Sequence, residues 1–128
     1  MFFFRNGSCF LFLTVDNILV ISRDSSLTRT LKWTLEDAGF VVLLSLSVET
    51  SFLDEVQNEP IVVIVDADST NSEKLWQTTQ YLSWFHRRCP ILLLTDRHCE
   101  ELEENCDYCL PKTVRKDQLL SCIKECRY

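Results

Sequence analysis

The amino-acid sequence predicts an α/β protein in which helices cover both faces of a parallel β-sheet. Its most informative segment is residues 61–65, five consecutive β-branched residues that follow Pro60 and stop at the carboxylate of Asp66. An unbroken run of this kind is typical of a strand that is buried on both faces. Short apolar runs also alternate five times with segments of helical character, which is the order expected for a parallel sheet with crossover helices.

The five predicted strands are short apolar runs bounded by polar or turn-forming residues. Residues 17–21 are the first run, and residues 40–46 follow the turn residue Gly39. The β-branched run lies within residues 60–66, and residues 90–95 begin at a proline in the same way. Residues 108–110 make a short last strand.

The first predicted helix follows residues 22–26, which offer good N-cap side chains, and ends at Gly39, a natural helix stop. Apolar residues recur in it every three to four positions, as on one buried helix face: Leu27, Leu31, Leu35 and Ala38. Further helices are predicted over residues 48–59, 69–88, 97–104 and 116–128. The last of these carries Leu119, Leu120, Ile123 and Cys126 on one face.

Right-handed crossovers leave few topologies for this order of elements. The flavodoxin-like (βα)5 three-layer sandwich, with parallel sheet order 2-1-3-4-5, places the first and third strands at the switch point where ligands bind. The sequence has no G-x-G-x-x-G after its first strand and no G-x-x-x-x-G-K-[ST], which argues against dinucleotide-binding and P-loop proteins. We predict one domain over residues 17–128, preceded by a short apolar N-terminal extension at residues 1–16.

Composition narrows the partners and the compartment. The net charge of -6 argues against a nucleic-acid surface, and no apolar run is long enough to span a membrane. The apolar runs of residues 1–14 are split by Arg5-Asn6-Gly7-Ser8, which is unlike a signal peptide and indicates an extra strand or a segment that docks on a partner. Seven cysteines without a signal peptide indicate free thiols in the cytoplasm.

Polar residues are predicted to meet where the parallel strands end. The set comprises Ser22, Arg23 and Asp24 after the first strand, Asp66 after the third, Thr95 after the fourth and Lys112 after the fifth. A carboxylate nucleophile, a hydroxyl and an ammonium group would together suit an acyl phosphate on Asp66. The simpler alternatives are that Lys112 neutralises a partly buried carboxylate and that Thr95 satisfies backbone groups.

With these residues in this order, the segment from Asn17 to the C-terminus resembles the CheY-like receiver domain of two-component response regulators. Asn17-Ile-Leu-Val-Ile-Ser-Arg-Asp24 is similar to the family's first strand and acidic loop, and Pro60-Ile-Val-Val-Ile-Val-Asp66 to the segment that ends in the phosphorylated aspartate. Pro90-Ile-Leu-Leu-Leu-Thr95 and Leu110-Pro111-Lys112 are similar to the segments carrying the hydroxyl and the lysine. The resemblance implies a signalling module of a phosphorelay, not an enzyme.

The chain departs from the family pattern at the metal site. Ser22 and Arg23 stand where the family has two acidic residues that help to bind Mg²⁺, and Asp24 comes one residue later. Mg²⁺ requires hard oxygen ligands, whereas an arginine would compete with the metal and could pair with Asp66. If Mg²⁺ binds, its expected ligands are Asp24, Asp66 and Asp68.

Other family positions differ as well. Cys109 occupies the aromatic switch position of the last strand, Thr113 replaces the proline after the lysine, and Asp96 stands where a small residue is usual. The Met-Pro-x-x-x-Gly loop after the phosphorylated aspartate is absent. These departures favour a degenerate receiver, or pseudo-receiver, that needs no cofactor, acts through protein–protein interaction and is impaired in Mg²⁺-dependent phosphorylation of Asp66.

Three alternatives remain at this stage. The chain could be a receiver that accepts phosphate on Asp66. It could be a regulatory domain of a larger eukaryotic enzyme, because residues 22–26, 38–40 and 52–54 are similar to the region ahead of the catalytic part of some cyclic-nucleotide phosphodiesterases. It could also be a zinc or redox protein, in which Cys106-x-x-Cys109 and Cys122-x-x-x-Cys126 lie near His98 and Cys99.

The resemblance implies a protein partner or an attached effector domain, and a homodimer is a further alternative. Receivers signal through a face that corresponds here to the 97–104 helix, the 108–110 strand and the 116–128 helix. Its charged residues are Glu100, Glu101, Glu103, Glu104, Lys112, Arg115 and Lys116, which could equally form a solvated surface. Trp76 and Trp84 are alternative contact residues.

Overall fold

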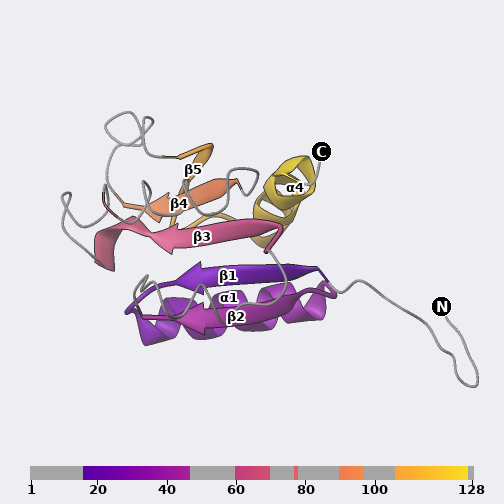
Figure 1. The fold of residues 1–128 in the computed structure, drawn as a ribbon, viewed down its shortest axis with the longest axis horizontal. Helices are drawn as coiled ribbons and strands as arrows, with labels where there is room; N and C mark the ends of the chain where they lie inside the picture. Colours follow the sequence, from indigo (N-terminus) through magenta and orange to yellow (C-terminus); the bar gives the residue numbers. More distant parts are fainter. Residues whose placement is uncertain (1–15, 47–59, 70–76, 78–89, 97–105, 127–128) are drawn as a thin grey trace, which may run out of the picture.

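Five strands form one sheet in the computed structural model of the chain (Figure 1), which describes residues 16–46, 60–69, 77, 90–96 and 106–126. The strands are β1 (Asn17–Ile21), β2 (Val41–Ser45), β3 (Val62–Asp66), β4 (Ile91–Thr95) and β5 (Tyr108–Pro111). The described helices are α1 (Ser25–Asp37) and α4 (Lys116–Cys126), and a 3-10 turn, η1 (Ala67–Ser69), follows β3.

The sheet has the predicted strand order, β2-β1-β3-β4-β5, and every neighbouring pair is parallel. Figure 1 shows the strand ends facing the same way, so that Asp66 of β3 and Thr95 of β4 lie at one edge of the sheet. Ile21 of β1 is in register with Val65 of β3, which brings the loop after β1 beside Asp66. The predicted flavodoxin-like fold is therefore confirmed.

Helix α1 begins and ends as its sequence dictates. Asp24 is the N-cap, and its carboxylate accepts hydrogen bonds from the backbone N–H groups of Ser26 and Leu27. Gly39 adopts a φ of 97° after the helix, a conformation that side-chain-bearing residues rarely adopt. The N–H of Phe40 still donates to the carbonyl of Leu35, which is why β2 starts at Val41 and not at the predicted residue 40.

Both faces of the central strands β3 and β4 are buried. On one face, side chains from β1, β3 and β4 pack against α1 and α4, for example Ile64 against the cluster that contains Leu35 and Ile123. The opposite face holds a second apolar cluster that includes Val63 and Leu93, both fully buried. The continuous β-branched run at residues 61–65 is explained by this double burial, because neither face of β3 meets water.

Several predicted features lie outside the described residues. They are the N-terminal extension up to residue 15, the helices predicted at residues 48–59 and 97–104, nearly all of the one at 69–88, and Trp76, Trp84, His98 and Cys99. Gln77 is helical, as predicted. None of the helices in the described part of the chain combines the length and apolar character that a membrane span requires.

Burial within the sheet predicts which leucines hold the fold together. Leu92→Ala removes a fully buried β4 side chain, and we expect the free energy of unfolding to fall by about 2–5 kcal/mol. The matched change Leu46→Ala, at a side chain that is 68% exposed, should shift it by less than about 0.5 kcal/mol. Urea denaturation of the two variants measures this difference, and equal losses would contradict the described core.

Candidate functional site

Asp66 is a buried carboxylate at the carboxyl end of β3, with 2% of its surface exposed. Its Oδ1 lies 3.0 Å from Nζ of Lys112 and also accepts from the backbone N–H of Asp68, at 3.1 Å. Its Oδ2 accepts a hydrogen bond of 2.8 Å from the hydroxyl of Ser22. Both oxygens are therefore engaged by donors of the chain itself, which offsets the desolvation of a buried charge.

Asp68 is a second acceptor, two residues further along. Its Oδ1 accepts from the hydroxyl of Thr95 at 2.8 Å, and its Oδ2 accepts from the backbone N–H of Asp96 at 2.7 Å. Nζ of Lys112 lies 3.3 Å from the same Oδ2. One ammonium group, 18% exposed, thus lies between two carboxylates that follow β3.

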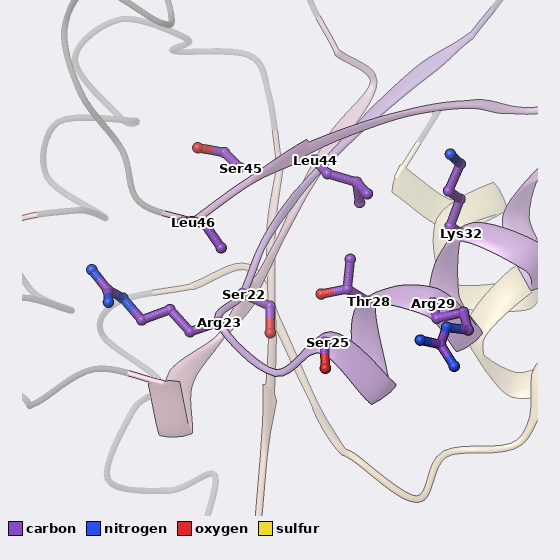
Figure 2. Close-up of a pocket in the computed structure, with 9 residues that line it drawn as sticks. All are labelled: Ser22, Arg23, Ser25, Thr28, Arg29, Lys32, Leu44, Ser45 and Leu46. Carbon is purple, nitrogen blue, oxygen red and sulfur yellow. The ribbon is translucent and has the colours of Figure 1, made fainter.

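The loop after β1 contacts Asp66 through the side chain of Ser22. The buried hydroxyl of Ser22 donates to Asp66 and accepts from the backbone N–H of Asp24 at 3.0 Å. The carboxylate of Asp24 caps α1, so it is directed at the helix. Arg23 is exposed, and Figure 2 shows its side chain extending away from the hydroxyl of Ser22.

The contacts of Asp68 and Lys112 shift the pKa values of both side chains. Burial disfavours the charged forms of Asp68 and Lys112, but the hydrogen bonds and opposite charges around them outweigh it. The pKa of Asp68 is consequently lowered by the N–H of Asp96, the hydroxyl of Thr95 and Lys112. The pKa of Lys112 is raised by Asp66 and Asp68, so the lysine stays charged throughout the physiological pH range.

These residues do not fit a Mg²⁺ site in the arrangement described. The three carboxylates expected to ligate the metal, Asp24, Asp66 and Asp68, already accept hydrogen bonds from backbone N–H groups, hydroxyls and Lys112. Lys112 itself places a positive charge within 3.3 Å of two of them. A divalent ion needs several oxygen ligands, and the loop after β1 offers the Ser22 hydroxyl and the exposed Arg23 where the resemblance would place two carboxylates.

The cysteines of the described part do not gather into a metal site. No group of three or more potential His, Cys, Asp or Glu ligands is found among the described residues. Burial raises the pKa of Cys122, and burial together with Cys122 raises that of Cys126 to about 12, so both thiols are protonated and poorly nucleophilic. Cys109 packs against the second apolar cluster.

The strand-end residues predicted from the sequence take three different places. Ser22 and Lys112 contact Asp66 directly, whereas Thr95 contacts Asp68. The carboxylate of Asp24 serves the helix, and Arg23 is exposed. Asp68, expected from the sequence only as a ligand if Mg²⁺ binds, accepts hydrogen bonds from the hydroxyl of Thr95 and the backbone N–H of Asp96. The sequence feature that could have indicated this role is the spacing Asp66-x-Asp68 at the end of a buried strand.

Several solved structures with the same fold are response regulators or their receiver domains. The chain matches a response regulator receiver domain protein from Clostridium thermocellum with a TM-score of 0.75 and 22% identity, over 88% of this chain and 94% of that one. A response regulator from Thermotoga maritima matches with a TM-score of 0.74 and 19% identity, over 88% and 98% of the two chains. Full-length FixJ from B. japonicum matches with a TM-score of 0.70 and 22% identity, over 87% of this chain and 57% of that one.

No sequence family and no curated protein sequence matches the chain. The structural likeness, at 15–22% identity for the matches to receiver proteins, establishes the receiver fold and leaves the chemistry of the site to its own residues.

Lys112→Met tests the role of the ammonium group. The change leaves Asp66 buried without its cation, and we expect the free energy of unfolding to fall by about 3–5 kcal/mol near neutral pH. The matched change Lys116→Met breaks an exposed ion pair with Asp37 and should cost about 0–1 kcal/mol. Denaturant unfolding measures both, and adding Asp66→Asn to Lys112→Met should restore part of the loss. A Lys112→Met variant as stable as the wild type would contradict the ion-pair assignment.

The lowered pKa of Asp68 predicts a contribution to acid stability. Stability from a carboxyl group of lowered pKa is present above the pKa of the unfolded state and is lost as the pH falls through the folded-state pKa. Asp68→Asn should therefore flatten the fall of the melting temperature between about pH 5 and pH 2. The control Asp117→Asn, at a side chain 74% exposed, should keep the wild-type slope. Melting curves across this pH range measure both slopes, and an Asp68→Asn slope equal to that of the wild type would contradict the prediction.

Proposed function

We propose that residues 17–128 form a receiver-like regulatory module of the pseudo-receiver type, which acts through protein–protein interaction. In this proposal the module keeps the receiver scaffold and the Asp66–Lys112 pair, and Mg²⁺-dependent phosphorylation of Asp66 is impaired. The module is not itself an enzyme and works in the cytoplasm, where its free thiols stay reduced.

The observation that best supports the proposal is that both carboxylate oxygens of Asp66 already contact donors of the chain itself. The Ser22 hydroxyl donates to Oδ2 of Asp66, and the Lys112 ammonium pairs with Oδ1. The family resemblance would place an acidic metal ligand at position 22 instead. An attacking carboxylate would have to release the Ser22 hydroxyl, and it would lack a divalent cation to neutralise the incoming phosphoryl oxygens. The local donors therefore favour a stable ground state of Asp66 over its phosphorylation.

The fold and the surface support a role in protein contacts. Trp33 on α1 is 76% exposed, and exposed aromatic side chains are enriched at protein–protein interfaces. The match to full-length FixJ covers only 57% of that chain, so a receiver fold can be one part of a longer protein. A protein partner or an attached effector domain is the expected target, and the resemblance to the regulatory region of some phosphodiesterases falls within this proposal.

Treatment with a small phosphodonor tests the proposal. The protein is incubated with acetyl phosphate and Mg²⁺, and its intact mass is measured beside that of Asp66→Asn. We expect no phosphoryl adduct on either protein, because Lys112 and Ser22 hold Asp66 and its surroundings do not fit the metal. A single adduct on the wild type that is absent from Asp66→Asn would instead establish the alternative, a phosphorylatable receiver.

The double change Ser22→Asp/Arg23→Asp tests why the metal does not fit. It restores acidic residues at the two positions where the family resemblance expects them, and it places a carboxylate beside Asp66. We expect the variant to be less stable than the wild type without metal, because like charges meet, and to gain stability with Mg²⁺. A hundredfold excess over the dissociation constant corresponds to about 2.7 kcal/mol.

Melting temperatures with and without Mg²⁺ measure this gain. The wild type and the single variant Arg23→Gln are the controls, and neither should respond to the metal. A wild type that is stabilised by Mg²⁺ as strongly as the double variant would contradict the proposed loss of the metal site.

A further inference from the structure

A groove lies on the other side of the loop after β1, between α1 and the end of β2 (Figure 2). It encloses about 370 Å³. Thr28, Arg29 and Lys32 of α1 form one wall. Leu44 and Leu46, at the end of β2, form the other.

The helical wall is basic although the protein is acidic. Arg29 and Lys32 lie one turn apart on α1, and Arg23 lines the same groove, whereas no acidic side chain is found among its lining residues in the described part of the chain. The net charge of the chain is -6, so this concentration of positive charge runs against its composition. Within the described residues neither Arg29 nor Lys32 enters an ion pair, although Glu36 stands four residues after Lys32.

The strand wall is apolar and open to solvent. Leu44 of β2 is 40% exposed and Leu46, which directly follows β2, is 68% exposed, whereas the leucines of β1 and β4 are buried. The hydroxyl-bearing residues Ser25 and Thr28 also line the groove (Figure 2). The groove therefore offers apolar contacts on its strand side and cationic and hydroxyl donors on its helical side.

We propose that this groove binds a small soluble organic phosphate that carries a short apolar body. The guanidinium of Arg29 and the ammonium of Lys32 would donate to the phosphate oxygens, since charge-assisted hydrogen bonds to phosphate are the strong ones and Arg is suited to them. The apolar body would cover Leu44 and Leu46. The volume of about 370 Å³ lies at the lower end of the range for small-molecule sites.

The volume favours a compact ligand over an extended surface. A lipid bilayer would need basic and apolar side chains spread over a broad face, whereas the basic and apolar side chains here line one groove beside a strand end. The site is separate from the Asp66 pocket in its ligand chemistry, because Asp66 is anionic and faces Ser22 and Lys112. Ser22 is the residue that the two share.

Titration with hexyl phosphate tests the assignment. Isothermal titration calorimetry of the full chain should show one saturable site that weakens as salt is added. Arg29→Gln/Lys32→Gln should weaken binding about tenfold or more, because charge-assisted hydrogen bonds are lost. The control Arg115→Gln/Lys124→Gln removes the same charge from exposed residues at α4 and just before it, and should change the affinity less than twofold.

A separate experiment tests the apolar wall of the groove. Leu46→Ser should weaken hexyl phosphate about threefold to tenfold and leave methyl phosphate unchanged, because only the longer molecule reaches the leucines. Circular dichroism and melting temperature confirm that each variant is folded, which is expected because the substituted side chains are exposed.

Four results would overturn the proposal. They are the absence of saturable binding in the millimolar range, equal losses in the groove and control double variants, binding only to vesicles that contain phosphatidic acid, and binding only to an acidic peptide such as Glu-Glu-Leu-Glu-Glu. The last two would assign the groove to a membrane or to a protein partner instead.

Discussion

The buried ion pair between Asp66 and Lys112 is the interaction on which the rest of the site depends. A carboxylate that is 1% exposed at the end of a central strand cannot remain charged without a partner, and the lysine that follows β5 supplies one at 3.0 Å. The pair joins the third and fifth strands of the sheet, across β4. Because Lys112 also reaches Asp68, the two carboxylates share one cation, and their geometry is fixed by the same side chain.

The remaining polar contacts extend this pair across the edge of the sheet. Ser22 ties the loop after β1 to Asp66, and Thr95 ties the end of β4 to Asp68. Four strand ends are thereby linked through two carboxylates. Buried polar groups that are fully satisfied in this way rigidify their surroundings, whereas the loss of one partner leaves others unpaired. The arrangement thus favours one fixed state of the edge, which suits a module that presents a constant surface.

Much of the fold could be predicted from local sequence signals. The unbroken run at residues 61–65 requires burial on both faces, and Asp24 and Gly39 delimit α1 through their own backbone chemistry. The convergence of Ser22, Asp66 and Lys112 follows from the parallel topology alone. The use of Asp68 as the acceptor for Thr95 could not be predicted, because a carboxylate at the end of a strand has several donors within reach and three-dimensional packing selects among them. The exposure of Trp33 likewise depends on which helix face meets the sheet.

The loop after β1 shows why the departures from the receiver pattern act together. A serine at position 22 is short enough to donate to Asp66 and to accept from the N–H of Asp24, which holds the loop in the conformation that lets Asp24 cap α1. A carboxylate at position 22 could accept that N–H but could not donate to Asp66 unless it were protonated, so it would require a cation between the two acids. The serine at position 22 therefore supplies by its own hydroxyl the donor that Asp66 needs on this side, which supports the proposed pseudo-receiver. The next residue, the exposed Arg23, lines the neighbouring groove.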